Sequence, residues 1–172
     1  MRVISKVATW AIMSLCVILS MNNAVANEEV DSETMCLAKN IYYEAGAEHF
    51  RGKIAVAQVT VNRSEHELFP KTICGVVQQR TQVGNKIICQ FSWNCNPVGK
   101  IRYLSNAWRE SLLVAKQVMA DKLGIEPLNT ALYFHNVQVN PNWRLERIAR
   151  IGNHVFYSQT PADKKSLTTN QK

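Results

Sequence analysis

The stretch NIYYEAGAEH, residues 40–49, decides the fold because a helix ends inside it and a carboxylate stands at that end. Upstream of it and up to Ala45, apolar side chains recur at three- and four-residue steps, which is typical of an amphipathic helix. Gly46 is the residue type that commonly stands just past a helix end. The pattern therefore predicts a helix that starts near Asp31 or Ser32 and stops directly after Glu44 and Ala45.

Glu44 extends the stripe that Leu37 and Ile41 form on this helix, because residues spaced i, i+4 and i+7 share one face. A carboxylate in partly apolar surroundings loses hydration, which raises its pKa. The negative end of the helix dipole disfavours an anion there as well. Both effects predict a glutamic acid that holds a proton near neutral pH and can donate it. A surface ion pair with Arg51 is the alternative.

The rest of the chain predicts an α+β domain that is mainly helical, with a small β-element near the C-terminus. The segment after the first helix is apolar nearly all round, as in a core helix, although its valines and threonine also allow a strand. The expected elements are helices over about 52–63, 73–79 and 105–122, an irregular region over 64–103, and strands over 131–135 and 155–157.

The first 26 residues carry the features of an export signal. Two basic residues precede a mostly apolar run over 7–19, and Ala24-Val25-Ala26 offers a cleavage site between small residues. The run is shorter than the ~20 residues of a membrane span, although an uncleaved anchor is the alternative. We expect a signal peptide over 1–26, one domain over 27–159, and a polar, disordered tail over 160–172.

Removal of the signal leaves four cysteines, namely Cys36, Cys74, Cys89 and Cys95. An even number in an exported chain predicts two disulfides, and all three pairings remain open. A structural zinc site is disfavoured because no CxxC spacing occurs.

The charge of the chain is basic, at +7 in full and +5 without the signal. A net positive charge of this size suits an anionic partner such as a wall polymer or a membrane surface, although general solubility explains the charge equally well. Export argues against a nucleic-acid partner.

Several short blocks follow one another in a fixed order along nearly the whole mature chain. They are NIYYEA (40–45), GKIAVAQV (52–59), NR (62–63), FP (69–70), IC (73–74), CQFSW (89–93), ALYFH (131–135), Trp143 and RIGNHVFY (150–157). In this order they resemble the spore-cortex-lytic cell-wall hydrolases, the SleB family. The resemblance implies a lysozyme-like, compact and mainly helical domain that acts on peptidoglycan, with its essential glutamate at Glu44.

The resemblance also implies lytic transglycosylation of the glycan between N-acetylmuramic acid (MurNAc) and N-acetylglucosamine (GlcNAc). Glycoside cleavage needs an acid for the leaving oxygen and a means to trap the oxocarbenium-like centre. If the muramic acid 6-hydroxyl attacks its own anomeric carbon, Glu44 suffices as acid and then base, with no metal or cofactor. An ordinary muramidase would need Glu48 or Glu65 to activate water, and we expect Glu48 among solvated neighbours.

Other residues of these blocks suit a sugar groove through hydrogen bonds or ring stacking. The candidate substrate-binding residues are Tyr43, Asn62, Gln90, Ser92, Tyr133, His135 and Trp143. Arginines at positions 144, 147 and 150 could meet the carboxylates of stem peptides. A structural role is the alternative for the aromatic rings and the histidine, and a solvated face is the alternative for the arginines.

Two other functions remain open. A zinc amidase would take ligands from His49, His135 and His154, with Glu44 or Glu48, but no HExxH motif is present. A non-catalytic wall-binding module would not need Glu44 at all. We expect an enzyme that binds peptidoglycan as a monomer, in the periplasm or outside the cell, without stable membrane insertion once the signal is removed.

Overall fold

The computed structural model describes residues 29–96 and 99–160. The expected signal peptide and the expected disordered tail, apart from Thr160, lie outside these residues. The chain divides into two compact units, Met1–Val30 and Asp31–Lys172, and every helix and strand named below belongs to the second unit. None of the described helices has the length and apolar character needed to cross a bilayer.

Helix α2 (Ser32–Ala45) is the predicted first helix. It begins where the Asp31 carboxylate accepts hydrogen bonds from the backbone N–H groups two and three residues further on, at 2.9 and 3.0 Å. It ends at Gly46, whose φ of −58° is ordinary helical backbone. A side chain at Gly46 would bring its Cβ to 2.3 Å from the Tyr42 carbonyl oxygen. Glycine is therefore required here by a close approach rather than by a left-handed turn.

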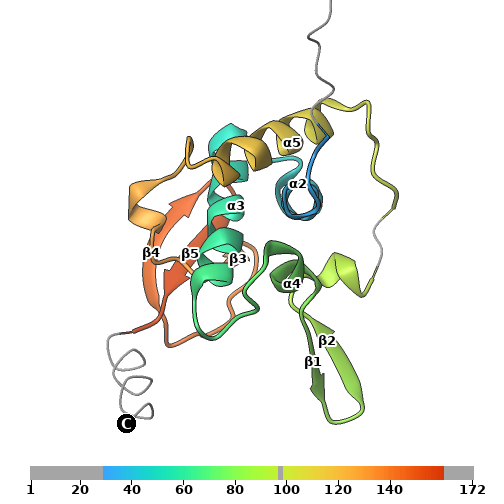
Figure 1. Ribbon diagram of the computed structural model, residues 1–172. Helices are drawn as coiled ribbons and strands as arrows, with labels where there is room; N and C mark the ends of the chain where they lie inside the picture. The colour runs from blue at the N-terminus through green and yellow to red at the C-terminus, as the bar shows by residue number, and fades with distance from the viewer. Residues whose placement is uncertain (1–28, 97–98, 161–172) are drawn as a thin grey trace, which may run out of the picture. The chain divides into compact units, whose positions relative to one another are not determined.

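Helix α3 (Phe50–Glu65) is the core helix of the domain, and the alternative of a strand is wrong. Figure 1 shows it between α2 and α5 (Asn106–Met119) on one side and the C-terminal sheet on the other. Every residue from 52 to 60 is buried. A helix with neighbours on both sides can be apolar all round, which explains why its sequence shows little amphipathic character.

The C-terminal sheet consists of β3 (Tyr133–Asn136), β4 (Glu146–Ile151) and β5 (His154–Ser158), in the antiparallel order β3-β5-β4. A short 3-10 helix, η2 (Glu126–Leu128), precedes it. Strands β3 and β5 were predicted, whereas β4 was not. The register of β4 shifts between Arg147 and Ala149, and such a bulge interrupts the alternation that identifies a strand. The predicted class, mainly helical α+β with a small β-element near the C-terminus, is confirmed.

The region predicted to be irregular contains more regular structure than expected. Its short helix α4 (Ile73–Gln78) was predicted. It is followed by an unpredicted antiparallel hairpin of β1 (Arg80–Val83) and β2 (Lys86–Cys89), and by the 3-10 turn η1 (Ser92–Asn94). Neither strand has a buried face, so the sequence lacks the apolar alternation of a half-buried strand.

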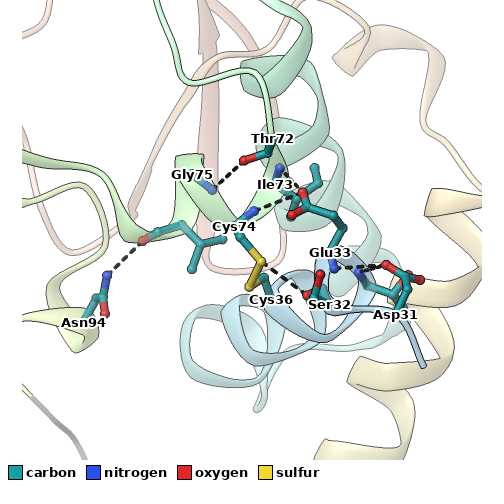
Figure 2. The surroundings of a disulfide bond; sticks show 11 residues. Asp31, Ser32, Glu33, Cys36, Thr72, Ile73, Cys74, Gly75 and Asn94 are labelled. Atoms are coloured by element: carbon teal, nitrogen blue, oxygen red, sulfur yellow. Dashed lines mark hydrogen bonds between the residues drawn. A yellow bond between two sulfur atoms is a disulfide. The ribbon is translucent and has the colours of Figure 1, made fainter. Parts of the chain in front are cut away.

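The four cysteines form two disulfides, Cys36–Cys74 and Cys89–Cys95. The first joins α2 to α4, and the second closes a short loop after β2. Figure 2 shows the first disulfide beside Glu33, whose carboxylate accepts from the backbone N–H groups of the first two residues of α4, at 2.5 and 3.2 Å. A covalent bond and a helix cap therefore hold α4 against the start of α2.

Glu48, in the turn between α2 and α3, has a side chain that is largely shielded from solvent, which corrects the expectation of solvated surroundings. Its side chain is 9% exposed and accepts hydrogen bonds from the backbone N and the side-chain Nδ2 of Asn153, at 3.3 and 3.0 Å. At Gly152 the φ is +58°, and a Cβ there would lie 2.0 Å from Glu48 Oε2. Glu48 thus fastens this turn to the turn between β4 and β5.

The two disulfides should contribute unequally to stability. Replacing Cys36 and Cys74 by alanine removes a cross-link between residues 38 positions apart. Because the unfolded chain is then less constrained, we expect the free energy of unfolding to fall by about 3–4 kcal/mol. Replacing Cys89 and Cys95, 6 positions apart, should cost about 2 kcal/mol because the closed loop is shorter. Urea unfolding followed by circular dichroism measures both losses. A larger loss for the shorter loop would contradict this expectation.

Candidate active site

Glu44, one residue before the end of α2, lines a cavity of about 310 Å³. Leu37 and Ile41 on the same helix face are fully buried, and Glu44 is half-buried. The walls come from α2, α3, the segment after β2, strand β3 and the loop that follows it. The lining residues are Glu44, Arg63, Cys89, Gln90, Phe91, Ser92, Tyr133, Phe134 and Trp143.

The pKa of Glu44 is raised to about 7, in the direction that the sequence predicts. Burial is the main cause, because removal of water disfavours the carboxylate. The nearby positive charge of Arg63 acts in the opposite direction and is outweighed. Within the described part of the chain, no hydrogen bond or ion pair engages the Glu44 carboxyl group. A substantial fraction of this acid therefore keeps its proton near pH 7, and the group is free to contact a ligand.

Arg63, near the C-terminal end of α3, forms the inner wall of the cavity and was missed by sequence reasoning. It is 3% exposed, and its Nε donates a hydrogen bond to the Leu132 carbonyl oxygen at 2.6 Å. Burial lowers its pKa to about 10, so the guanidinium remains charged at neutral pH. A signal was present in the sequence, because Arg63 continues the stripe of Val56 and Thr60 at i+4 and i+7 on a helix that is otherwise apolar.

Three aromatic rings surround the Arg63 guanidinium, with centroids 5.4 to 5.9 Å from its central carbon. They belong to Phe69, Phe91 and Tyr133. Such contacts stabilise a desolvated cation through the negative faces of the rings. The rings therefore help to keep a positive charge inside the domain, close to the carboxyl group of Glu44.

Gln90 and Ser92 form the polar wall that the sequence predicted. When the Gln90 amide is oriented with its oxygen toward Arg63, that oxygen accepts from both terminal nitrogens of the guanidinium, at 3.1 and 3.3 Å. The Gln90 amide NH₂ is then available as a donor in the cavity. Ser92 starts η1 and is exposed, so its hydroxyl can also reach a ligand.

Tyr133 and Trp143 form the aromatic wall. Trp143 is 41% exposed, and its ring makes edge contacts with Tyr133, His135 and Tyr157, at centroid distances of 6.1, 5.5 and 5.7 Å. His135 stacks on Tyr157 and its Nε2 lies 2.9 Å from the Tyr157 hydroxyl oxygen. His135 therefore packs against Trp143 and Tyr157 and does not line the cavity.

Like His135, two further predicted substrate-binding residues, Tyr43 and Asn62, lie outside the lining of the Glu44 cavity. Tyr43 stacks on Trp93 with ring centroids 4.5 Å apart, and its hydroxyl donates to the Gly99 carbonyl oxygen. Asn62 lines a separate cavity of about 250 Å³. Its Nδ2 donates to the carbonyl oxygens of Leu128 and Ala131, at 2.7 and 2.9 Å. Asn62 thus holds the segment that leads into β3.

The other candidate acids do not join Glu44 in its cavity. Glu48 is bonded to Asn153, and Glu65 is exposed beside the Asn62 cavity. Among the described residues that line the Glu44 cavity, Glu44 is the only carboxylic acid.

The histidines considered for a zinc site also lie apart, and each makes different contacts. His49 caps α3 by accepting from the Gly52 N–H, His135 packs against Trp143, and His154 is buried 3.9 Å from Glu48. Within residues 29–96 and 99–160, no group of three histidine, cysteine, aspartate or glutamate side chains is placed to hold a metal ion.

Comparison with known proteins agrees with the fold. The sequence pattern of the cell wall hydrolase family matches residues 47–157 of this chain. Spore cortex-lytic enzymes of Oceanobacillus iheyensis and Bacillus subtilis are 28% and 27% identical to this chain, over 129 and 130 residues and 73% of the chain in each case. The matched regions are 41% and 37% of those enzymes, so the chain spans less than half of their length.

A solved structure shares the fold. The catalytic domain of the germination-specific lytic transglycosylase SleB from Bacillus anthracis superposes with a TM-score of 0.53 at 25% identity, covering 78% of this chain and 100% of that one. The predicted lysozyme-like domain and the resemblance to the SleB family are thereby confirmed. The family match begins after Glu44, so the role of Glu44 rests on the geometry of the cavity.

The raised pKa of Glu44 predicts a stability that depends on pH. Between about pH 4.5, the usual value, and about pH 7, the unfolded chain releases this proton first, so the wild type loses stability as the pH rises. Glu44→Gln has no such titration. Its free energy of unfolding relative to the wild type should therefore increase by about 1–3 kcal/mol from pH 4.5 to pH 8.

Urea unfolding at a series of pH values measures this difference between the variant and the wild type. A difference that stays constant across the series would show that the folded protein does not perturb Glu44.

Proposed function

Because the chain belongs to the cell wall hydrolase family, we propose that it is a peptidoglycan lytic transglycosylase that cuts the MurNAc–GlcNAc glycosidic bond. The B. anthracis relative with the same fold carries the name of a lytic transglycosylase. The observation that carries the proposal is the cavity of Glu44, where one carboxylic acid has a pKa of about 7 and no second carboxylate is among the described lining residues. An ordinary glycosidase normally uses two.

In the first step Glu44 acts as the general acid. It transfers its proton to the glycosidic oxygen as the bond from the MurNAc anomeric carbon to that oxygen breaks, and the GlcNAc side leaves with a hydroxyl group. The step creates a carboxylate on Glu44 and positive charge on the sugar ring. The buried guanidinium of Arg63 lowers the energy of the new carboxylate, since its charge favours the ionised form.

In the second step Glu44 acts as the general base. Its carboxylate takes the proton of the MurNAc 6-hydroxyl while that oxygen forms a bond to the anomeric carbon. The product is a 1,6-anhydro ring, and Glu44 is protonated again for the next cycle. No water is consumed, so no further carboxylate is needed to activate one.

The walls of the cavity suit a sugar with N-acetyl and hydroxyl groups. The amide NH₂ of Gln90 and the hydroxyl of Ser92 can donate to carbonyl and hydroxyl oxygens, and the exposed ring of Trp143 can cover an apolar sugar face. Tyr133 stands beside Trp143 and completes this aromatic wall. Hydrogen bonds and stacking of this kind hold the glycan so that the scissile oxygen meets Glu44.

We further propose that the protein works as an exported monomer, in the periplasm or outside the cell, with peptidoglycan as its partner. The two disulfides support an oxidising compartment. Neither a nucleic acid nor stable insertion in a membrane is part of this proposal.

The product of digestion tests the proposal directly. Purified peptidoglycan treated with the mature protein should yield muropeptides with 1,6-anhydro-MurNAc ends, detected by mass spectrometry. Glu44→Gln should lower the rate about 10²–10⁴-fold, because the variant has no proton to donate. Glu65→Gln, which removes an exposed acid of the same type, is the matched control and should retain the rate. Reducing ends would indicate a muramidase instead, and free stem peptides would indicate an amidase.

The pH dependence of the rate provides a separate test. Glu44 must be protonated to act as an acid, and its pKa is about 7. We therefore expect kcat/KM on solubilised glycan to be flat below about pH 6 and to fall about tenfold per unit well above pH 7. A rate that stays constant up to pH 9 would mean that another group supplies the proton.

A further inference from the structure

The positive charge of the mature chain is concentrated in one tract. Residues 68–109 contain six lysines and arginines and no aspartate or glutamate. The remainder of the chain after residue 26 contains 12 basic and 13 acidic residues. The net charge of +5 therefore comes from this tract, and charge segregated in this way creates a local positive potential.

The β1–β2 hairpin, residues 80–89, lies within this tract, and we name it the basic ribbon. Figure 1 shows it extending away from the helices below α4. All of its strand residues except Cys89 are exposed. Its charged residues are Arg80 and Lys86, and neither forms an ion pair with any residue that the structure describes.

The basic ribbon also exposes apolar side chains on both faces. The cross-strand register pairs Val83 with Lys86 and Thr81 with Ile88, so these four side chains share one face. Ile87 lies on the other face with Arg80. Val83, Ile87 and Ile88 are 55%, 63% and 53% exposed. A two-stranded ribbon with uncovered apolar side chains gains stability when a partner covers it.

The basic ribbon is continuous with the Glu44 cavity. Strand β2 ends at Cys89, and Cys89 and Gln90 both line the cavity. The base of the ribbon is held by the Cys89–Cys95 disulfide and by a hydrogen bond from the Gln90 N–H to the Gln79 carbonyl oxygen, at 2.9 Å. A polymer that leaves the cavity on the side of Cys89 and Gln90 therefore meets the base of the ribbon.

We propose that the basic ribbon binds the stem peptides of the peptidoglycan strand whose glycan occupies the Glu44 cavity. Arg80 and Lys86 would contact the free carboxylates of these peptides, and the exposed valine and isoleucines would cover the methyl groups of their alanines. This inference rests on the proposed function for the identity of the polymer. It assigns the recognition of peptide carboxylates to the exposed cations of the ribbon, whereas the buried guanidinium of Arg63 in the cavity is engaged by Leu132 and Gln90.

Wall binding by charge variants tests the role of the ribbon. In the Glu44→Gln background, Arg80→Gln with Lys86→Gln should weaken co-sedimentation with sacculi about 5–30-fold at low salt, since two ionic contacts are lost. The sacculi are stripped of protein, lipid and phosphate polymers. Lys39→Gln with Lys122→Gln removes the same charge outside the tract and should change binding less than twofold. An equal loss in both variants would overturn the proposal.

The chemistry of the partner is tested on modified sacculi. Amidation of the stem-peptide carboxylates should reduce binding of the parent protein to the level of the ribbon variant. Binding that is unchanged by amidation would overturn the proposal. A ribbon variant that binds native sacculi normally but loses binding to phosphatidylglycerol vesicles would also overturn it, in favour of a lipid surface.

These measurements are separate from the test of catalysis. If the wild type releases no 1,6-anhydro product but the ribbon variant still binds the wall poorly, the proposed reaction fails and the ribbon assignment stands. If the anhydro product appears and the ribbon variant binds as well as its control, the ribbon assignment fails alone. On short soluble glycans without stem peptides, Arg80→Gln with Lys86→Gln should retain the full rate.

Discussion

The burial of one carboxyl group, Glu44 at the end of α2, sets the acid–base chemistry of the cavity. Burial raises its pKa to about 7, against the opposing charge of Arg63. An acid with a pKa near the working pH can both donate and accept a proton, whereas an acid of ordinary pKa would be ionised before it could donate. The buried guanidinium keeps the shift moderate, so that the carboxylate formed during a reaction is not prohibitively unstable.

The scaffold holds α2 at several points along its length, which positions Glu44. At the start of the helix, the Cys36–Cys74 disulfide and the cap by Glu33 bind it to α4. In the middle, buried Asn40 donates to Thr60 of α3 and accepts from the ring N–H of Trp93. Just after its end, the bonds of Glu48 to Asn153 fasten the turn to the sheet. A group held on rigid elements in this way keeps its geometry better than a group on a loop.

The cavity and the basic ribbon form one continuous surface with two kinds of chemistry. The cavity offers an acid with a pKa of about 7, an amide and aromatic rings, with the buried Arg63 guanidinium in its wall, which suit the hydroxyl and N-acetyl groups of a sugar. The ribbon offers exposed cations and aliphatic side chains, which suit an acidic peptide. Peptidoglycan contains both components, so the proposed enzyme would contact the glycan in the cavity and the peptide on the ribbon.

The sequence by itself determined the features that depend on local spacing. The i, i+4, i+7 relation of Leu37, Ile41 and Glu44, followed by a glycine, located the acid and the direction of its pKa shift. The ordered blocks identified the family, and the apolar run of α3 identified the core helix. Each of these depends on neighbours within one helix or on the order of short motifs, both of which can be read along the chain.

Packing between elements far apart in the chain determines which residues share the cavity. Arg63 lies beside Glu44 because two helices pack together, while its neighbour Asn62 points toward another cavity. Glu48 appeared solvated in the sequence, but Asn153 and Gly152 shield it from more than a hundred positions away. The β1–β2 hairpin and the bulged β4 lack apolar alternation, so their pairing depends on backbone hydrogen bonds that side-chain patterns do not record. A contact across the fold is set by packing, and the periodicity of a single element carries no information about its partner.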